Sequence, residues 1–187
     1  DPVGRLTQAT NPDSTYSSVS YNLESVTRID ENTHKQQETY DAYGQITQVK
    51  EYNGSDTYTT NYQYDSQNNL TKITDAKGTT TTITYDSLGR KIKMSDPDMG
   101  EWSYAYDDLG NLKQQTDAQG QVIEFEYDEL SRLTKKKVTS PETKTLASYS
   151  YDDSAKDYCV GRLSKVTDQN STTEFYYDKL GRETKST

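Results

Sequence analysis

The most regular feature of the chain is the strict alternation of apolar and polar residues over short stretches. Ile123, Phe125 and Tyr127 fall on one side of an extended chain, and Glu124 and Glu126 fall on the other. Successive side chains of a strand point to opposite faces, so this pattern predicts antiparallel strands that are half-buried on one aromatic face. The same alternation recurs at Trp102/Tyr104/Tyr106, Tyr62/Tyr64, Tyr149/Tyr151 and Phe175/Tyr177.

Turn residues divide the chain into hairpins, as residues 70–90 show. Leu70–Thr74 is expected to form a strand and Thr79–Tyr85 the return strand, with turns at 75–78 and 86–89. Each turn begins with Asp, whose side chain can bond nearby backbone N–H groups, and ends with Gly, which tolerates positive φ. The next unit repeats the scheme with strands at Leu112–Thr116 and Gln121–Tyr127. The sequence therefore predicts repeated β-hairpins with short turns.

The outgoing strands depart from simple alternation, because their apolar residues are three positions apart. The pairs are Leu6/Ala9, Val26/Ile29, Ile46/Val49, Leu70/Ile73 and Leu163/Val166. A flat strand would place the members of each pair on opposite faces. Either a β-bulge intervenes or the first residue belongs to the preceding turn, and the sequence leaves both possibilities open.

A Tyr-Asp dipeptide marks the end of each return strand and gives the period of the repeat. The tyrosine recurs at Tyr40, Tyr64, Tyr85, Tyr106, Tyr127, Tyr151 and Tyr177, at intervals of 21 to 26 residues. With a truncated unit at Asp1–Leu6 and a degraded one around Tyr21, residues 1–187 are expected to form a single array of about nine hairpins, a piece of a longer protein. Two segments, 139–148 and 153–160, are interpreted as insertions that lengthen loops.

Composition changes this picture in one respect. Only 29% of the residues are hydrophobic and the mean hydropathy is −1.11, values that are typical of disordered chains. The chain nevertheless contains 17 Tyr beside 2 Phe and 1 Trp, and Tyr favours half-buried strands. An ordered sheet with a thin apolar layer is therefore expected in place of a thick core.

Charge and candidate chemistry exclude several functions. The net charge of −9 disfavours nucleic acid as a partner, and the run Lys135–Lys137 is interpreted as the solvated face of a strand. No stretch is apolar enough for membrane insertion. The single His34 and the single Cys159 show no local signature of a nucleophilic pair. No cofactor motif is present, and no catalytic, cofactor-binding or metal-binding residue is assigned.

The repeated aspartates could be interpreted as a carboxylate array or as a calcium site. Identical carboxylates in identical surroundings favour a turn role instead, because catalytic pairs need different environments and calcium needs six to eight oxygens at one point. The arginine that follows the turn glycine is expected to pair with the aspartate of an adjacent unit. The turn leucines Leu88, Leu109, Leu130 and Leu180 are expected to tuck under the rim of the sheet.

The pattern Tyr-Asp-x-x-Gly-Arg-Leu at this spacing resembles the YD repeat of RHS-type proteins. Its best matches are Tyr85–Arg90, Tyr106–Leu112, Tyr127–Leu133 and Tyr177–Arg182. The resemblance implies hairpins joined edge to edge into one long, twisted and curved open sheet, part of a hollow shell. It also implies flanking YD repeats and an enclosed cargo domain as partners. Nothing resembles the family's self-cleaving segment, so no proteolytic residue is carried over.

The resulting hypothesis is a non-enzymatic shell segment that encapsulates a toxin domain, in a secreted or cell-surface bacterial protein. The alternative is a module that binds glycans or a protein at the cell surface through its tyrosines. Self-association through the sheet edges is also expected. The residues assigned to the structural repeat are Tyr40, Asp41, Gly44, Tyr64, Asp65, Tyr85, Asp86, Gly89, Arg90, Tyr106, Asp107, Gly110, Tyr127, Asp128, Arg132, Tyr151, Asp152, Gly161, Arg162, Tyr177, Asp178, Gly181 and Arg182.

Overall fold

The computed structural model describes all residues, 1–187, and contains strands and turns but no helix. Two compact units are distinguished, Asp1–Asp98 and Met99–Thr187, and each is described by itself. The chain contains no helix that could span a membrane.

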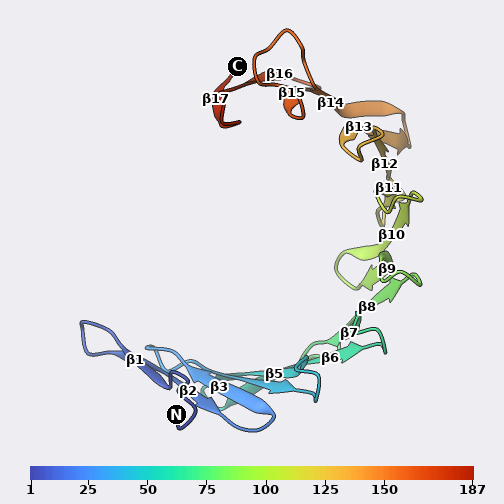
Figure 1. The fold of residues 1–187 in the computed structure, drawn as a ribbon. Coiled ribbons are helices and arrows are strands. Elements are labelled where there is room, and N and C mark those ends of the chain that lie inside the picture. Colours follow the sequence, from blue (N-terminus) through green and yellow to red (C-terminus); the bar gives the residue numbers. More distant parts are fainter. The chain divides into compact units, whose positions relative to one another are not determined.

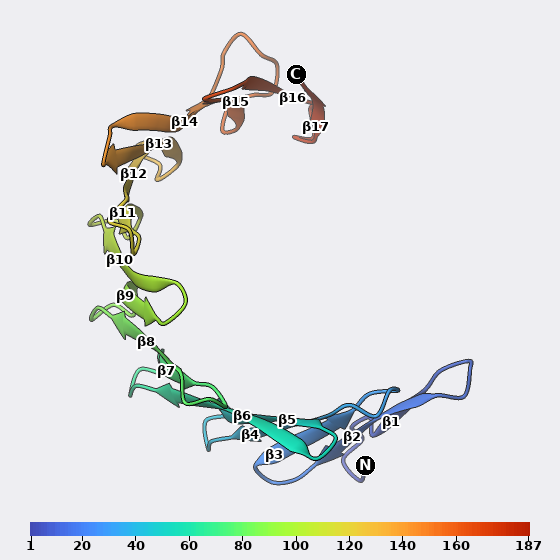
Figure 2. The same cartoon turned by 180° about the vertical axis from the view of Figure 1, so that it is seen from behind.

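The first unit is an open antiparallel meander in which β1 to β9 pair in chain order (Figures 1 and 2). Its strands are β1 (Gln8–Thr10), β2 (Tyr16–Tyr21), β3 (Ser25–Ile29), β4 (Lys35–Tyr40), β5 (Ile46–Asn53), β6 (Asp56–Tyr64), β7 (Leu70–Thr74), β8 (Thr80–Tyr85) and β9 (Lys91–Asp96).

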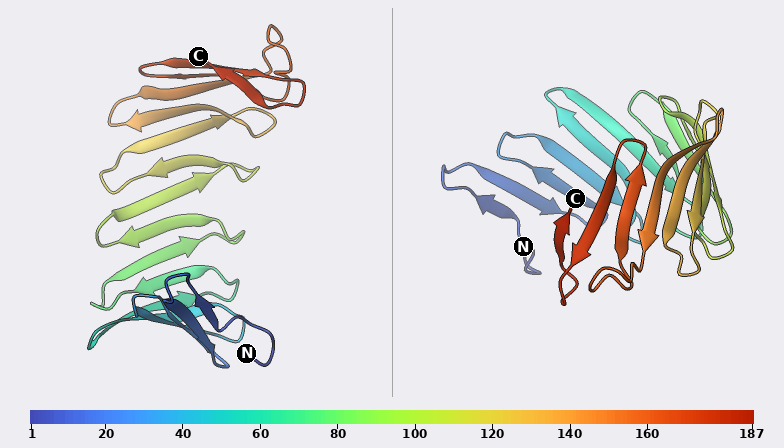
Figure 3. Two further views of the ribbon diagram at one scale, coloured as in Figure 1. Left: turned by 90° about the vertical axis from the view of Figure 1, so that its left-hand side faces the viewer. Right: turned by 90° about the horizontal axis from the view of Figure 1, so that it is seen from above.

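The second unit follows the same plan, and its strands lie side by side with turns at both edges (Figure 3, left). Its strands are β10 (Gly100–Tyr106), β11 (Leu112–Thr116), β12 (Val122–Tyr127), β13 (Leu133–Ser140), β14 (Lys144–Tyr151), β15 (Leu163–Asp168), β16 (Thr172–Tyr177) and β17 (Glu183–Ser186). The prediction of an all-β fold built from antiparallel hairpins is confirmed.

The register resolves the spacing of the outgoing strands. Gln63 of β6 lies opposite Lys72 of β7, but Tyr64 lies opposite Leu70, so Thr71 is an extra residue in β7. This is a β-bulge, and it brings Leu70 and Ile73 onto the face of their partner tyrosines. Of the two possibilities that the sequence left open, the structure adopts the bulge for Ile46/Val49, Leu70/Ile73 and Leu163/Val166. The pair Val26/Ile29 differs, because β3 pairs with β2 without a register shift.

The bulge recurs at every Tyr-Asp turn, where the turn leads into the outgoing strand. A register shift precedes Tyr40, Tyr106, Tyr127, Tyr151 and Tyr177, and Tyr85 as well. In four strands the extra residue is a threonine whose hydroxyl donates to the carbonyl of the residue before the tyrosine. These bonds are Thr47 to Thr39 (3.3 Å), Thr71 to Gln63 (3.1 Å), Thr134 to Glu126 (3.1 Å) and Thr184 to Tyr176 (3.2 Å).

Burial is shallow throughout, as the low hydropathy predicted. Only Cys159 and Ser164 are fully buried. In β10 the exposure alternates, with Trp102, Tyr104 and Tyr106 half-buried and the residues between them exposed. The apolar layer is therefore one residue thick on one face of the sheet.

The segment 139–148 differs from the expected loop. Residues 139–140 belong to β13 and residues 144–148 to β14, so only 141–143 form the turn. The extra residues lengthen both strands because they can continue the antiparallel ladder, as the pairing of Lys137 with Thr145 shows. The loop prediction was wrong here.

Two lysines of the run in β13, Lys135 and Lys137, form ion pairs with glutamates of β12 and remain partly exposed to solvent. Lys137 Nζ lies 3.1 Å from Glu124 Oε2 and 2.9 Å from Glu126 Oε1, and Lys135 Nζ lies 3.3 Å from Glu126 Oε2. Hydrogen bonds from Lys137 lower the pKa of Glu126, and hydrogen bonds to both glutamates raise the pKa of Lys137. The charges on this face of β12 and β13 are thus balanced by ion pairs between the two strands.

Candidate functional site at the Tyr-Asp turns

Each Tyr-Asp turn is built around the carboxylate of its aspartate. Asp86 Oδ1 accepts hydrogen bonds from the backbone N–H groups of Leu88 and Arg90, both at 2.9 Å. The backbone closes the same loop, because Gly89 N donates to Asp86 O and Asp86 N donates to Arg90 O. These bonds favour the charged carboxylate, and the bond from the Arg90 N–H contributes most to lowering the pKa of Asp86.

The arrangement is shared by turns at both edges of the sheet. The paired bonds to Oδ1 recur at Asp1, Asp30, Asp41, Asp65, Asp75, Asp117, Asp128 and Asp178. The repeated aspartates are therefore hydrogen-bonded to their own turns. Across residues 1–187, no group of three or more His, Cys, Asp or Glu side chains is close enough together to hold a metal ion.

The second carboxylate oxygen holds the fifth residue of the turn. Arg90 Nε donates to Asp86 Oδ2 at 2.7 Å, and the equivalent bonds of Arg132 and Arg182 measure 2.7 and 2.8 Å. Where the fifth residue is asparagine, as at Asn69 and Asn111, its Nδ2 makes the same bond at 3.0 Å. The arginine thus pairs first with its own turn.

The fifth residue also reaches the next turn along the edge. Arg132 donates from its second terminal nitrogen to Asp152 Oδ2 at 2.6 Å, which is the pairing between adjacent units expected from the sequence. The hydrogen bond to Asp152, followed by the one to Asp128, raises the pKa of Arg132. Asn111 Nδ2 similarly donates to Ser131 Oγ at 3.1 Å. Side chains from one turn therefore connect neighbouring hairpins along this edge.

The tyrosine closes the open end of its hairpin. Tyr85 ends β8, and its hydroxyl donates to the carbonyl of Leu70 at the start of β7 at 2.9 Å. Equivalent bonds join Tyr21 to Leu6 (3.2 Å), Tyr64 to Ile46 (2.9 Å), Tyr127 to Leu112 (3.0 Å), Tyr151 to Leu133 (2.9 Å) and Tyr177 to Leu163 (2.8 Å). We call this bond the tyrosine clasp.

Burial against the sheet raises the pKa of the clasp tyrosines Tyr64, Tyr85, Tyr127, Tyr151 and Tyr177. Sequence analysis predicted the aromatic face but missed the clasp. Its signal was the constant pairing of an aliphatic residue at the strand start with a tyrosine at the end of the same hairpin.

Comparison with known proteins explains the recurrence of this turn. Residues 40–80, 64–98 and 106–145 each match the RHS repeat, and together these stretches cover more than half of the chain. The chain belongs to the RHS repeat family. The resemblance to YD-repeat proteins drawn from the motif is therefore confirmed.

The fold is also similar to solved structures. The crystal structure of TcdB2-TccC3-Cdc42 superposes with a TM-score of 0.80 at 16% identity, and the crystal structure of TcdB2-TccC3 without its hypervariable C-terminal region does so with 0.80 at 17%. A Photorhabdus luminescens Tc holotoxin pore with mutated TccC3 gives 0.80 at 18%. Each match covers 100% of this chain but only 11% of the other chain, so residues 1–187 correspond to a small part of those proteins. No curated protein sequence is significantly similar to the chain.

The turn leucines of these RHS repeats do not tuck under the rim. Leu88, Leu109, Leu130 and Leu180 are 74, 74, 72 and 68% exposed. The reason lies in the turn itself, because the aspartate bonds the N–H of this residue and so fixes its backbone with the side chain pointing outward. That prediction was wrong.

The insertion at 153–160 forms a loop, as expected, and contributes buried groups. Lys156 Nζ donates to the carbonyl of Ser164 at 3.0 Å, lies 3.2 Å from Glu174 Oε2 and stands 4.7 Å from the centre of the Tyr176 ring. Its side chain is only 10% exposed. The loop thus packs on β15 and β16 and buries Cys159 completely.

His34 was considered together with Cys159 as a nucleophilic pair, and it lies in the turn between β3 and β4. Its Nδ1 stands 2.8 Å from Asp30 Oδ2, in the position that arginine occupies in the Tyr-Asp turns. His34 is therefore accounted for by its own turn.

Proposed function

We propose that residues 1–187 form part of the wall of an RHS shell that encloses a cargo domain, without catalysing a reaction. The partners are flanking RHS repeats and the enclosed domain of the same protein. That protein is bacterial and is secreted or exposed at the cell surface. Membership of the RHS repeat family and the fold similarity to TcdB2-TccC3 support this proposal.

The observation that carries the proposal is the continuity of the sheet within each unit. Every strand from β1 to β9 and from β10 to β17 pairs with its neighbours in chain order. The hairpin ends are closed by tyrosine clasps, so the backbone groups that a loose edge would expose are bonded. A single layer of paired strands has little core but separates its two sides, which is what a container wall requires.

Protease protection tests the proposal in the longer protein that contains this segment. The cargo region should resist proteolysis in the intact protein and should become sensitive at the urea concentration at which the wall unfolds. A variant with Tyr127→Ala and Tyr151→Ala loses two neighbouring clasps and should expose the cargo at lower urea. The control Leu130→Ala removes a side chain that is 72% exposed and should leave protection unchanged.

Two results would contradict the proposal. The first is a cargo region that is cut in native buffer as fast as the isolated cargo domain. The second is a protected region whose sensitivity to protease is independent of the unfolding of residues 1–187.

A further inference from the structure

The Tyr-Asp turns of the second unit place a row of exposed apolar side chains along one edge of its sheet. Its members are between 68 and 76% exposed, and we call them the leucine row: Leu109, Leu130, Val160 and Leu180. They lie in the turns that follow β10, β12, β14 and β16, and alternate turns of an antiparallel meander share an edge (Figure 3, left). Val160 belongs to the insertion but precedes a glycine as Leu180 does, so the insertion keeps the row.

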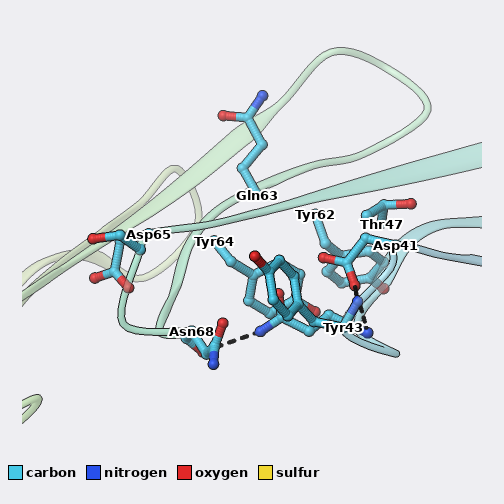
Figure 4. A pocket seen from close by; sticks show the side chains of 10 residues that line it. Asp41, Tyr43, Thr47, Tyr62, Gln63, Tyr64, Asp65 and Asn68 are labelled. Carbon is cyan, nitrogen blue, oxygen red and sulfur yellow. Dashed lines mark hydrogen bonds between the residues drawn. The ribbon is translucent and has the colours of Figure 1, made fainter.

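The corresponding row of the first unit is less regular. Val3, Tyr43 and Leu88 hold the same turn position and are exposed, but Gln67 interrupts their row with a polar side chain. Tyr43 also lines a hollow at this edge together with Tyr64 (Figure 4). The uninterrupted row is therefore the one in the second unit.

The same turn carries a polar residue in this position at the opposite edge. Asp117 bonds the N–H groups of Gln119 and Gln121 as Asp128 bonds those of its own turn, yet the third residue is Gln119. In the first unit this position holds Asn32 and Lys77, and all three residues are exposed. The turn therefore does not require an apolar side chain. A single exposed leucine needs no explanation, whereas a row of them confined to one edge indicates a contact surface.

The spacing of the leucine row restricts what can cover it. Neighbouring members are two strands apart, which is about 10 Å along the edge. A partner that contacts all of them must present apolar groups at the same interval over about 30 Å. A second copy of the chain presents such a row, and a two-fold axis brings two identical rows together in a closed dimer.

Charges at the two ends of the row select one of the possible two-fold arrangements. Asp108 precedes Leu109 at one end, Lys179 precedes Leu180 at the other, and both charged residues are exposed. A two-fold axis perpendicular to the sheet at the middle of the row places Asp108 of each copy opposite Lys179 of the other. An axis that runs along the row would instead bring like charges together, which is unfavourable.

We propose that the leucine row is the interface of a symmetric dimer of this chain, with Asp108 of each copy opposite Lys179 of the other. Four aliphatic side chains from each copy bury less than the roughly 1,600 Å² of a standard interface, so the dimer is weak, with a Kd of about 0.1 mM. The contact uses turn side chains and is therefore independent of the unpaired backbone edge of β17. It also does not depend on the wall function.

Sedimentation equilibrium over about 0.01 to 1 mM chain measures this dimer. The double variant Leu109→Ser with Leu180→Ser removes half of the apolar side chains of the interface and should raise the Kd about tenfold or more. Gln119→Ser changes an exposed residue of the same turn type at the opposite edge and should leave the Kd unchanged. Unchanged circular dichroism will show that the variants fold, because the backbone bonds of the turns are kept.

An exchange of charges tests the orientation of the two copies. Asp108→Lys and Lys179→Asp should each weaken the dimer, because each variant brings like charges together at both ends of the row. An equimolar mixture of the two variants should associate more strongly than either alone, because each end then pairs a lysine with an aspartate. Lys144→Asp makes the same change in charge beside an opposite-edge turn, and its mixture with Asp108→Lys should show no such gain.

Three results would overturn the proposal. The first is a chain that stays monomeric over the whole concentration range. The second is a Leu109→Ser/Leu180→Ser variant that associates as the unchanged chain does, which is the behaviour expected of pairing through β17. The third is a mixture of Asp108→Lys with Lys179→Asp that associates no more strongly than its components.

Discussion

The tyrosine clasp can be tested by removing a single hydroxyl. Tyr151 and Tyr149 lie two positions apart on the same face of β14, and both are half-buried. The Tyr151 hydroxyl donates to the carbonyl of Leu133 at 2.9 Å, whereas the Tyr149 hydroxyl makes no hydrogen bond within the protein. Tyr151→Phe and Tyr149→Phe therefore remove the same atom from similar surroundings, one bonded and one free.

The expected cost follows from that difference. A neutral intramolecular hydrogen bond contributes about 0.5–1.5 kcal/mol net, and the ring keeps its packing in both variants. The Arg132 guanidinium, 4.4 Å from the centre of the Tyr151 ring, can stack on phenylalanine as well. Tyr151→Phe should thus lower the free energy of unfolding by about 1 kcal/mol, and Tyr149→Phe by much less. With a urea slope of about 2 kcal/mol/M, the midpoint falls by about 0.5 M.

Urea unfolding followed by far-UV circular dichroism measures this effect, and alkaline pH gives a second test. Burial raises the pKa of Tyr151 in the folded chain. The stability contributed by the neutral phenol is therefore complete below the unfolded pKa of about 10 and is lost as the pH rises through the folded pKa. The difference between the unchanged chain and Tyr151→Phe should shrink in that range. The reasoning fails if the two phenylalanine variants are equally stable at neutral pH.

Three further predictions concern the turns and the edges. Gly100→Ala and Gly120→Ala both place a side chain at positive φ, at 74° and 78°, and should each lose about 1–2 kcal/mol. Gly100→Ala should lower the free energy of unfolding in urea by about 1–3 kcal/mol more than Gly120→Ala. The reason is that a Cβ at position 100 would stand 2.4 Å from Ala118 Cβ, whereas a Cβ at position 120 would meet no atom within 4 Å. Equal losses in the two variants would contradict this prediction. The pKa values of turn carboxylates such as Asp86 and Asp128 are lowered in the folded chain. The stability that these carboxylates contribute should therefore be complete above pH about 4 and should be lost as the pH falls through their folded pKa values. A free energy of unfolding that rises between pH 4 and pH 2 would refute the turn role. The unpaired edge of β17 should cause self-association that grows with concentration and with salt, which screens the charge of −9; a sedimentation coefficient that is constant with both would exclude it.

The strands were predictable because the fold is one layer deep. A sheet that buries one face imposes a period of two on every return strand, and nothing else competes for that pattern. Leu70–Thr74 and Leu112–Thr116 accordingly begin and end where the sequence placed them. The bulge was not decidable, because alternation describes regular pairing and says nothing of an extra residue such as Thr71.

The failures come from features that composition does not encode. Leu88 was expected to tuck under the rim of the sheet, but the hydrogen bond from its N–H to Asp86 fixes the backbone, and its side chain is 74% exposed. The segment 139–148 was interpreted as a loop because it departs from the repeat, although its residues could extend the ladder. A hollow lined by Tyr43, Gln45 and Asn68, between the turns that follow β4 and β6, was missed for a related reason, because its residues break the pattern in two different turns.

The unusual composition follows from the same geometry. A wall of one layer has no interior in which phenylalanine or leucine could be fully buried, so each ring on its apolar face keeps an edge near water. Tyrosine fits that position because its hydroxyl can donate to the carbonyl at the other end of the hairpin, as Tyr85 does to Leu70. Phenylalanine would cover the same area and leave the carbonyl unbonded. The 17 tyrosines and 2 phenylalanines are thus the composition expected when hairpins are stabilised at their ends and by their neighbours. By this reasoning, a low hydropathy indicates disorder only if the aromatic residues are scarce as well.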